Sequence, residues 1–478
     1  MLRPFTRRKT KWKKNPKEKR TKGNTKGKKS FPFPFKYKTK GGKLIGRGGY
    51  GCIFSPPLKC RGKSVSSNRS TRYVSKLLDK ESAHKEFRTI EKIKNMLKTI
   101  PNFANYFLLD DFTICTPDKL SPEDVVNFQE CSTLLPEENK SNYPDSKEIT
   151  HYLEYVNNPD FLAAHRVITM PYGGTEVNDF LKSPVVAQNY SLFYKLHRHL
   201  VELFFNGIVP MNRDNHVYHN DLKASNILVL MEQRQTKEPP EKSSSMKTRI
   251  IDWGVTFVYR PVNVQSSPSV PRSVENARPP LLFARMEGPI PDQMRHSILE
   301  FNRPFSVVLF SKRFRKTVDK EFASFVSRRL PTKHFVLSFL REMLKEKKGH
   351  FPLIHRILMM MQKKERMLFT EDMALNIIAD YLSVLIDKYP HSLYHYINHV
   401  YIHLVDFTGF LSTYWPMLQH FGLIYPTGSK NETQLYLLLC DLFWEYLYKP
   451  RMEAVSLSQF RSHLDAISTV LYQLQTEK

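Results

Sequence analysis

One short stretch, residues 217–229, constrains the fold and chemistry of this chain more than any other. It reads VYHNDLKASNILV, which predicts a polar loop that leads directly into a buried strand. Residues 252–254 read DWG and follow a second apolar pair, Ile250-Ile251. A carboxylate, a lysine, an amide and a second carboxylate, in this order, are groups that suit phosphate oxygens and hard divalent cations. The two segments together therefore predict a site for phosphate chemistry.

A glycine-rich run precedes that stretch. Residues 46–53 read GRGGYGCI and are flanked by short apolar segments typical of strands. Glycines there let backbone N–H groups approach phosphate oxygens without a Cβ in the way. An ordinary glycine turn is one alternative, and a dinucleotide-binding turn is another. The latter continues directly into a helix, whereas Pro56-Pro57 and a polar stretch follow here.

Lys76 lies in a predicted strand, with a predicted helix over residues 81–97 after it. A lysine that binds phosphate needs a carboxylate to hold it in place. Glu86 is our choice because isoleucines follow it at i+4 and i+7, which puts it on the face that packs inward. Glu91 and Glu81 remain alternatives. An exposed strand lysine without a role is the plain alternative for Lys76.

Taken together and in this order, the motifs between Gly46 and Gly254 resemble the eukaryotic-type protein kinase superfamily. The long insertions and the run FNRPFS at residues 301–306 look like the divergent serine/threonine kinases of large DNA viruses. The resemblance implies an α+β, two-lobed protein-kinase-like fold, with a small β-rich lobe and a larger, mostly helical lobe carrying insertions. It also implies transfer of the ATP γ-phosphate to Ser/Thr hydroxyls of protein substrates, with Mg²⁺.

The resemblance implies a role for each candidate catalytic residue. Asp221 would orient the substrate hydroxyl and accept its proton, and Lys223 would hold the γ-phosphate. Lys76, held by Glu86, would neutralise the α- and β-phosphates. These roles suit a loose phosphoryl-transfer transition state, in which positioning and charge neutralisation provide most of the catalysis.

The resemblance also implies binding roles. Asn226 and Asp252 would bind Mg²⁺ through oxygen. At the hinge, adenine would lie beside Met170 to Tyr172, where Pro171 can offer its carbonyl and Tyr172 both backbone groups. The residues implied to bind ATP are Gly46, Arg47, Gly48, Gly49, Tyr50, Gly51, Cys52, Ile53, Phe54, Lys76, Met170 and Tyr172.

Composition divides the chain into three parts. Residues 1–40 contain 17 Lys or Arg and one acidic residue, which predicts a disordered basic tail. Such a tail can bind polyanions or nucleic acid or act as a nuclear address, and a merely solubilising tail is equally compatible. Residues 41–170 are expected to form the small lobe, with an insertion at about 113–165. Residues 171–478 are expected to form the large lobe, with a large insertion within about 255–400.

Finer patterns in the second half predict mostly helix. Apolar residues recur at helical spacing up to a predicted break at Gly207-Ile208-Val209-Pro210. Residues 231–247 and 261–292 are predicted to be loops because they are rich in proline, serine and charge. Aromatic-rich helical patterns fill about 332–475.

The five cysteines are widely spaced, with no Cys-x-x-Cys pair and no Cys/His cluster at zinc spacing. We expect unpaired thiols in a reducing compartment. No apolar run reaches the ~18 residues of a membrane span, and the N-terminus lacks a signal-peptide pattern. The sequence therefore predicts a soluble, intracellular protein without a membrane span, in a host cell or virion if the viral resemblance holds.

Three positions bear on how far the resemblance extends. Asn220 stands where most regulated kinases have an arginine that grips a phosphorylated activation loop, so constitutive activity is expected. Trp253 replaces a phenylalanine and can still pack. Asp406 is our candidate for the aspartate that braces the catalytic loop, with a surface aspartate at a helix start as the alternative. No clear A-P-E motif follows residue 254.

Three functions other than a protein kinase are compatible with parts of the sequence. A pseudokinase scaffold is expected to lack the lysine, the base or a metal ligand, and this chain has all of them. A small-molecule phosphotransferase of the aminoglycoside or choline type shares the H-x-D and the metal aspartate. The complete glycine loop and Lys223 argue against it. A nucleic-acid-binding protein is supported only by the tail.

Overall fold

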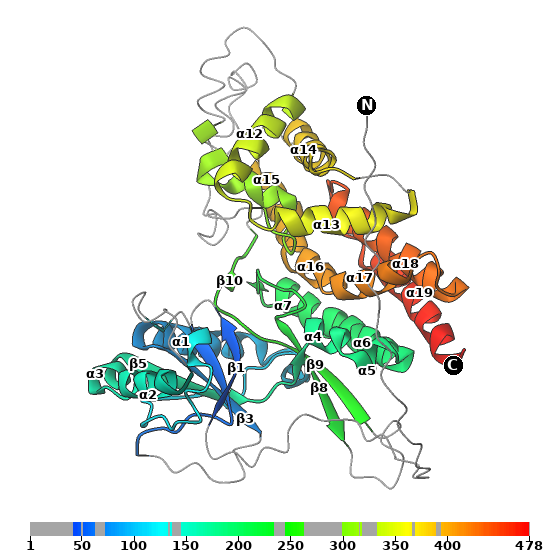
Figure 1. The fold of residues 1–478 in the computed structure, drawn as a ribbon. Helices are drawn as coiled ribbons and strands as arrows, with labels where there is room; N and C mark the ends of the chain where they lie inside the picture. Colours follow the sequence, from blue (N-terminus) through cyan, green and yellow to red (C-terminus); the bar gives the residue numbers. More distant parts are fainter. Residues whose placement is uncertain are drawn as a thin grey trace, which may run out of the picture. The chain divides into compact units, whose positions relative to one another are not determined.

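The fold is α+β, with an antiparallel sheet in the N-terminal part and mostly helices in the C-terminal part (Figure 1). Residues 41–478 form one unit by their internal contacts. The computed structural model describes residues 42–48, 51–62, 72–131, 134–135, 145–233, 244–261, 299–314, 316–317, 332–365, 369–388 and 393–477. The predicted disordered tail and most of the predicted loop at 261–292 lie outside these residues.

The sheet has five strands in the order β1-β2-β3-β5-β4, all paired antiparallel. The strands are β1 (Lys43–Gly48), β2 (Gly51–Ser55), β3 (Tyr73–Asp79), β4 (Thr113–Cys115) and β5 (His165–Pro171). β1 and β2 form a hairpin around the glycine-rich run, with Gly48 opposite Gly51. Gly51 must lack a side chain, because a Cβ there would clash with the carbonyl oxygen of Leu77. The predicted strands are confirmed.

The helix α1 (Lys80–Leu97) follows β3 directly and packs against β3 and β5 (Figure 1). It begins where the carboxylate of Asp79 accepts a hydrogen bond from the N–H of Ser82, as an N-cap does. Ile90 and Ile93 are buried, so the face carrying Glu86 turns inward as its spacing predicts.

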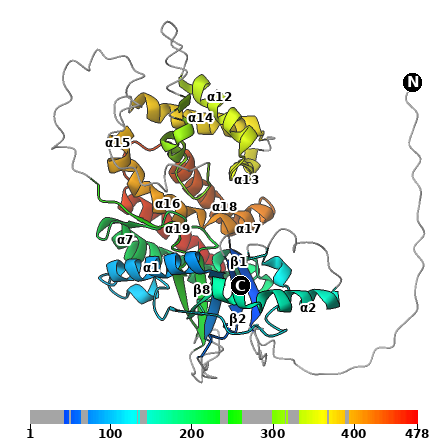
Figure 2. The ribbon, with the colours of Figure 1, turned by 90° about the vertical axis from the view of Figure 1, so that its left-hand side faces the viewer.

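The segment predicted as an insertion at about 113–165 is a folded layer of its own. Its first residues are β4, which belongs to the sheet, so the insertion begins later than predicted. It then contains α2 (Asp145–Val156), labelled in Figures 1 and 2, and α3 (Pro159–Ala164), labelled in Figure 1. Its apolar side chains share a core with strands β1 and β2, since Phe54 of β2 stacks on Phe128.

The prediction of unpaired cysteines is wrong for four of the five. Disulfides join Cys52 to Cys131 and Cys60 to Cys115, with Cα–Cα distances of 5.9 and 5.8 Å. Cys440 forms no disulfide, and it is buried. The pairs are 79 and 55 residues apart in sequence, so spacing along the chain could not reveal them. The expectation of a reducing compartment, which rested on unpaired thiols, loses that support.

Two predictions about the middle of the chain are also wrong. The predicted break at Gly207-Pro210 does not end the helix, because α6 (Tyr190–Glu202) continues through a π-helical turn, Leu203–Ile208, into α7 (Val209–Arg213). Pro210, which has no N–H to donate, lies next to this π-helical turn, where the regular i→i−4 hydrogen bonding is already interrupted. Within the predicted loop 231–247, both ends are strand: β8 (Ile227–Gln233) pairs with β9 (Ser244–Ile250).

The C-terminal part is predominantly helical, as predicted, and its core combines aliphatic side chains with many aromatic ones. The helix α16 (Ile402–Ser412) is buried along nearly its whole length. No helix in the described ranges is long and apolar enough to cross a membrane. The remaining helices are α4 (Val177–Lys182), α5 (Pro184–Ala187), α12 (Thr332–Glu346), α13 (Phe351–Met361), α14 (Glu371–Lys388), α15 (Leu393–Tyr396), α16 (Ile402–Ser412), α17 (Trp415–Ile424), α18 (Lys430–Phe443) and α19 (Leu457–Thr476).

Candidate active site

Two strand pairs bring the predicted catalytic loop beside the Asp-Trp-Gly segment. The loop runs from β7 (Val217–Tyr218) to β8, while the Asp-Trp-Gly segment runs from β9 to β10 (Phe257–Val258). β7 pairs with β10 and β8 pairs with β9, so both ends of the two segments are tied together. The N–H of Ile251 also donates to the carbonyl of Asn226 at 3.0 Å. Asn226 and Asp252 are therefore close in space, although 26 residues separate them.

The carboxylate of Asp221 lies at the centre of a hydrogen-bonded cluster. Its Oδ2 accepts from Lys223 Nζ at 2.8 Å and from Asn226 Nδ2 at 3.0 Å, while Oδ1 accepts from Asn302 Nδ2 at 2.8 Å. Burial opposes ionisation, but the hydrogen bond and charge of Lys223, with the hydrogen bond from Asn302, outweigh it and lower the pKa of Asp221. The structure brings together the three residues predicted here and adds Asn302.

Asn226 and Asp252 present oxygen atoms that suit Mg²⁺. The amide nitrogen of Asn226 donates to the backbone carbonyl and to Oδ2 of Asp221, and nothing in the described part of the chain donates to its amide oxygen. Asp252 is exposed and its carboxylate has no hydrogen bond to another described residue. Among the described residues no three His, Cys, Asp or Glu side chains gather as a metal site. Mg²⁺ typically takes one or two protein ligands and completes its shell with phosphates and water, so this donor set fits it.

The predicted pair of Lys76 and Glu86 forms in the structure. Lys76 Nζ lies 2.9 Å from Oε1 and 2.7 Å from Oε2 of Glu86, and the two side chains are 13% and 18% exposed. The alternatives, Glu81 and Glu91, are exposed and do not contact the lysine. The i+4 and i+7 spacing of the isoleucines thus selected the right carboxylate.

The glycine-rich run and the hinge are described in part. Gly49, Tyr50 and the side chain of Arg47 lie outside the described residues. Cys52 and Phe54 are fully buried in the core beneath β2, so their side chains are structural, and contact with a nucleotide would use their backbone.

At the hinge, the N–H of Tyr172 donates to the carbonyl of Arg72 at 2.7 Å. The expectation that both backbone groups of Tyr172 can serve adenine is therefore wrong, because the N–H is already used. The carbonyl of Tyr172 and the neighbouring backbone remain as candidate contacts. Met170, at the end of β5, is half-buried and pairs with Val74.

Asp406 braces the catalytic loop, as one of the two readings of the sequence predicts. It lies within α16 with its side chain 1% exposed, so the surface alternative is wrong. Oδ2 accepts from the N–H of His219 and from Asn212 Nδ2, and Oδ1 accepts from the N–H of Asn220, all at 2.8 Å. Burial raises the pKa of Asp406, and these hydrogen bonds oppose the rise. Gly409 lets α16 approach, because a Cβ there would lie 2.7 Å from Leu222 Cβ.

One hydrogen bond and one aromatic contact of His219 join the loop to the Asp-Trp-Gly segment. His219 Nε2 bonds the carbonyl of Ile251 at 2.8 Å, and its ring packs edge-on against Trp253 with centroids 4.9 Å apart. Trp253 also packs against Phe107 at 5.7 Å and is 3% exposed. The predicted packing of tryptophan at this position is confirmed.

Asn302 and Arg303 are site residues that sequence analysis missed as individuals. They appeared only within the run FNRPFS, without a role. Both are buried, with exposed fractions of 1% and 8%, directly before the fully buried 3-10 turn Phe305–Phe310. Two polar residues beside an apolar run indicate that both are buried and hydrogen-bonded. The pattern does not show which residues are their partners.

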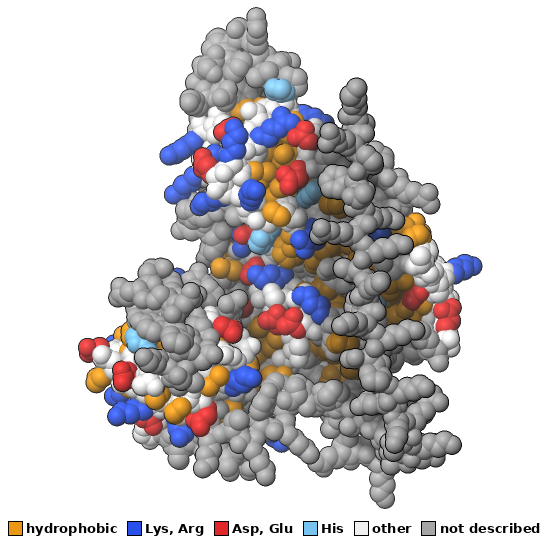
Figure 3. Space-filling model, in the orientation of Figure 1, with side chains coloured by type: hydrophobic (Ala, Val, Ile, Leu, Met, Phe, Trp, Pro, Cys, Tyr) orange, Lys and Arg blue, Asp and Glu red, His pale blue; other side chains and the backbone are white. Residues whose placement is uncertain are grey.

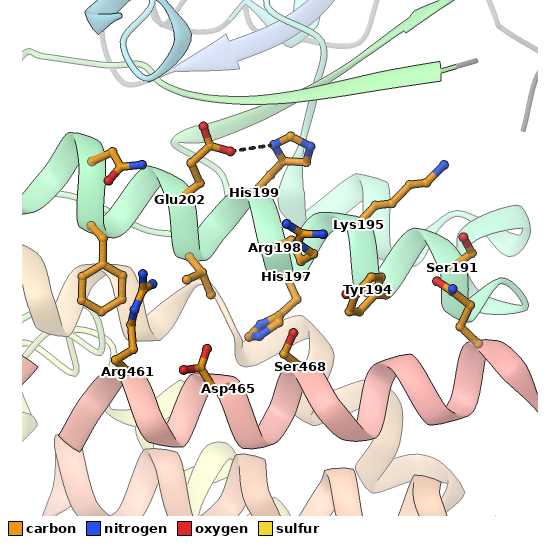
Figure 4. A pocket seen from close by; sticks show the side chains of 14 residues that line it. Ser191, Tyr194, Lys195, His197, Arg198, His199, Glu202, Arg461, Asp465 and Ser468 are labelled. Atoms are coloured by element: carbon orange, nitrogen blue, oxygen red, sulfur yellow. Dashed lines mark ion pairs between the residues drawn. The ribbon is translucent and has the colours of Figure 1, made fainter. Parts of the chain in front are cut away.

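A separate hollow lies between α6 and α19, with a cavity volume of about 1140 Å³ (Figure 4). Lys195, Arg198, Arg461 and Asp465 line it, and none of the residues discussed above does. His197 on its wall is fully buried between Tyr414 Oη and the carbonyl of Leu464, and burial lowers its pKa to about 4. This histidine is therefore neutral near pH 7, and its two hydrogen bonds give it a structural role.

No protein-family model matches this chain, and no curated protein matches it significantly. The function is therefore argued from the residues and their geometry.

Proposed function

We propose that this chain is a Mg²⁺-dependent serine/threonine protein kinase that uses ATP. The observation that carries the proposal is the cluster in which Lys223 and Asn226 hydrogen-bond the carboxylate of Asp221, with Asp252 on the adjoining segment. The Lys76–Glu86 pair and the five-stranded sheet followed by helices support the two-lobed fold that the resemblance implies. Each residue type and its place agree with phosphoryl transfer.

Asp221 would act on the acceptor hydroxyl. The lowered pKa keeps its carboxylate ionised near neutral pH, so it can accept a hydrogen bond from a serine or threonine hydroxyl and orient it. The hydroxyl oxygen forms a bond to the γ-phosphorus while the bond between that phosphorus and the bridging oxygen of ADP breaks. The hydroxyl proton passes to Asp221. A loose transition state asks for little activation of the nucleophile, so a weak base in the right place is sufficient.

Cationic side chains would neutralise the phosphates. Lys223 Nζ lies 2.8 Å from the carboxylate of Asp221, so a γ-phosphoryl group beside the base would lie within reach of this ammonium. Lys76, held by Glu86, would bind the α- and β-phosphates. Bound to Asn226 and Asp252, Mg²⁺ would supply further neutralisation of phosphate charge.

The mixed charge on the surface of the folded part favours residues 1–40 as the place of any polyanion-binding role. On the face shown in Figure 3, basic and acidic side chains are interspersed over α12 and α14. Arg313–Glu346, Lys333–Asp380 and Arg341–Asp372 are ion pairs there. A nucleic-acid-binding function for the folded part has no comparable support, and protein hydroxyls remain the proposed acceptors.

The test is transfer of label from γ-labelled ATP by the purified chain to a generic basic protein, followed by phosphoamino-acid analysis. We expect phosphoserine or phosphothreonine, and no transfer when EDTA removes Mg²⁺. Dominant phosphotyrosine would contradict the acceptor class. Label on an aminoglycoside or choline, without label on protein, would indicate a small-molecule phosphotransferase. Nucleotide binding without transfer to any acceptor would indicate a pseudokinase.

A further inference from the structure

The segment around Asn302 contacts three consecutive residues of the catalytic loop. Arg303 Nε donates to the carbonyl of Asn220 at 2.8 Å. Asn302 Nδ2 donates to Asp221 Oδ1 at 2.8 Å and to the carbonyl of Leu222 at 3.1 Å. Two adjacent side chains, about 80 residues away in sequence, thus hydrogen-bond to the residue before Asp221, to Asp221 itself and to the residue after it.

We propose that Asn302 is a positioning residue for Asp221, fixing the direction of its carboxylate for the acceptor hydroxyl. This inference rests on the proposed kinase function. Lys223 and Asn226 both hold Oδ2, so Asn302 alone supplies a hydrogen bond to Oδ1 among the described residues. Without Asn302 the carboxylate keeps its partners on one oxygen only and can rotate about its Cβ–Cγ bond. A small rotation of this kind is costly, because transfer requires near-attack geometry.

The surroundings of Asn302 agree with a positioning role. Its side chain is 1% exposed and its Oδ1 is buried without a hydrogen-bond partner. A buried amide that leaves one of its polar atoms unsatisfied is a net cost to stability, of a kind that proteins retain at functional sites. The side chain of Asn302 is thus oriented to donate its two hydrogen bonds to the loop, although this leaves its own Oδ1 without a donor.

Arg303 and Glu300 give the segment an anchor that needs no phosphate. Arg303 Nε lies 2.8 Å from a carboxylate oxygen of Glu300, and the two side chains are 9% and 21% exposed. This arginine reaches the backbone of Asn220, the position whose lack of a cation led us to expect constitutive activity. The anchor therefore holds Asn302 against Asp221 with charges already present in the chain.

The experiment compares Asn302→Leu with Asn398→Leu, the same change at another buried asparagine. Asn398 is 2% exposed and accepts from Tyr259 Oη, away from the carboxylate of Asp221. We expect kcat of Asn302→Leu to fall about ten- to a hundredfold, with KM for Mg·ATP within about twofold of the parent. Asn398→Leu should retain kcat within about threefold. Should Asn302→Leu fail to fold, as judged by its unfolding curve, Asn302→Ala carries the same prediction.

A double-mutant cycle with Asp221→Asn tests whether Asn302 acts through the carboxylate. We expect Asn302→Leu to lower the residual rate of Asp221→Asn by less than about twofold. A parent-like kcat in Asn302→Leu, or an equal fold-loss in both backgrounds, would overturn the proposal. A parent chain with no phosphotransfer activity would instead refute the proposed kinase function, so the two failures are distinct.

Discussion

The sheet region and the helical region hold their candidate catalytic residues in different ways. In the sheet region Lys76 is held by one partly exposed ion pair, and two disulfides tie the strands to the inserted layer. In the helical region the predicted catalytic loop donates buried hydrogen bonds to Asp406 and accepts one from Asn302, and no disulfide occurs among the described residues of this region. The sheet region should therefore respond to reduction, and the catalytic loop to single polar substitutions.

The largest effect is expected on the helical side, from Asp252→Asn. Exchange of a charged carboxylate ligand for a neutral amide should weaken Mg²⁺ binding and lower kcat by about a hundredfold or more, since a bound metal contributes several kcal/mol to such reactions. Asn tolerates the left-handed backbone at this position, where φ is 66°, so the unfolding curve should match that of the parent. Titration of ATP with and without Mg²⁺ measures the ligand role directly. Equal Mg·ATP affinity in variant and parent would contradict the assignment.

The next effect is on the sheet side, from replacing both Cys52 and Cys131 by serine. The disulfide Cys60–Cys115 lies within the segment that Cys52–Cys131 closes and shortens that loop to about 24 residues, so loss of Cys52–Cys131 should cost about 3.5 kcal/mol of unfolding free energy in the chain-entropy model. Urea unfolding of oxidised protein measures this, and reduction, which breaks both disulfides, should lower the midpoint of the parent at least to that of the oxidised variant. Cys440→Ser, at a buried cysteine that forms no disulfide, is the matched control. Equal unfolding midpoints for oxidised parent and double variant would remove the contrast between the two regions.

A smaller effect is expected from Asp406→Asn. The amide keeps the shape of the side chain but places an N–H₂ where the loop offers only donors, so hydrogen bonds worth about 1.5–3 kcal/mol are lost. Both the unfolding free energy and kcat should fall. Asp465→Asn, at an exposed aspartate of α19, should stay within about 0.5 kcal/mol of the parent. A kcat unchanged in Asp406→Asn would show that the loop does not depend on this brace.

The smallest effect is expected from deleting residues 1–40. These residues carry 17 Lys or Arg but none of the candidate catalytic residues, so kcat on a short neutral peptide should be unchanged. Binding to heparin or nucleic acid should weaken and lose salt dependence. A collapse of kcat on the neutral peptide would show that the tail belongs to the catalytic fold.

Local patterns predicted a large part of the candidate site. Helical spacing selects Glu86 as the partner of Lys76, and the family resemblance makes Asp406 a brace of the loop in one of its two readings. Contacts between segments distant in sequence were not predictable in the same way. Asn302 lies 81 residues from Asp221, and Cys52 lies 79 residues from Cys131.

The continued helix at Gly207-Pro210 shows a second limit of sequence patterns. Glycine and proline predict a break from local propensity. A π-helical turn between Leu203 and Ile208 and burial of the apolar face carry the helix past both residues. Packing against neighbouring elements outweighs the local free-energy cost of glycine and proline in a helix, which is a few kcal/mol. Local sequence patterns do not show which elements will pack together.

The most direct test of the account is γ-phosphate transfer by the parent chain and by Asp221→Asn, measured side by side with Mg·ATP affinity. The account predicts label on serine or threonine for the parent, and a loss of at least about a hundredfold in kcat for the variant, with Mg·ATP affinity retained. Asn at this position has nearly the same shape but cannot act as the base, so a loss of rate reports on the carboxylate where the unfolding curve of the variant matches that of the parent. Equal transfer rates for the two proteins would contradict the assignment of Asp221 as the base.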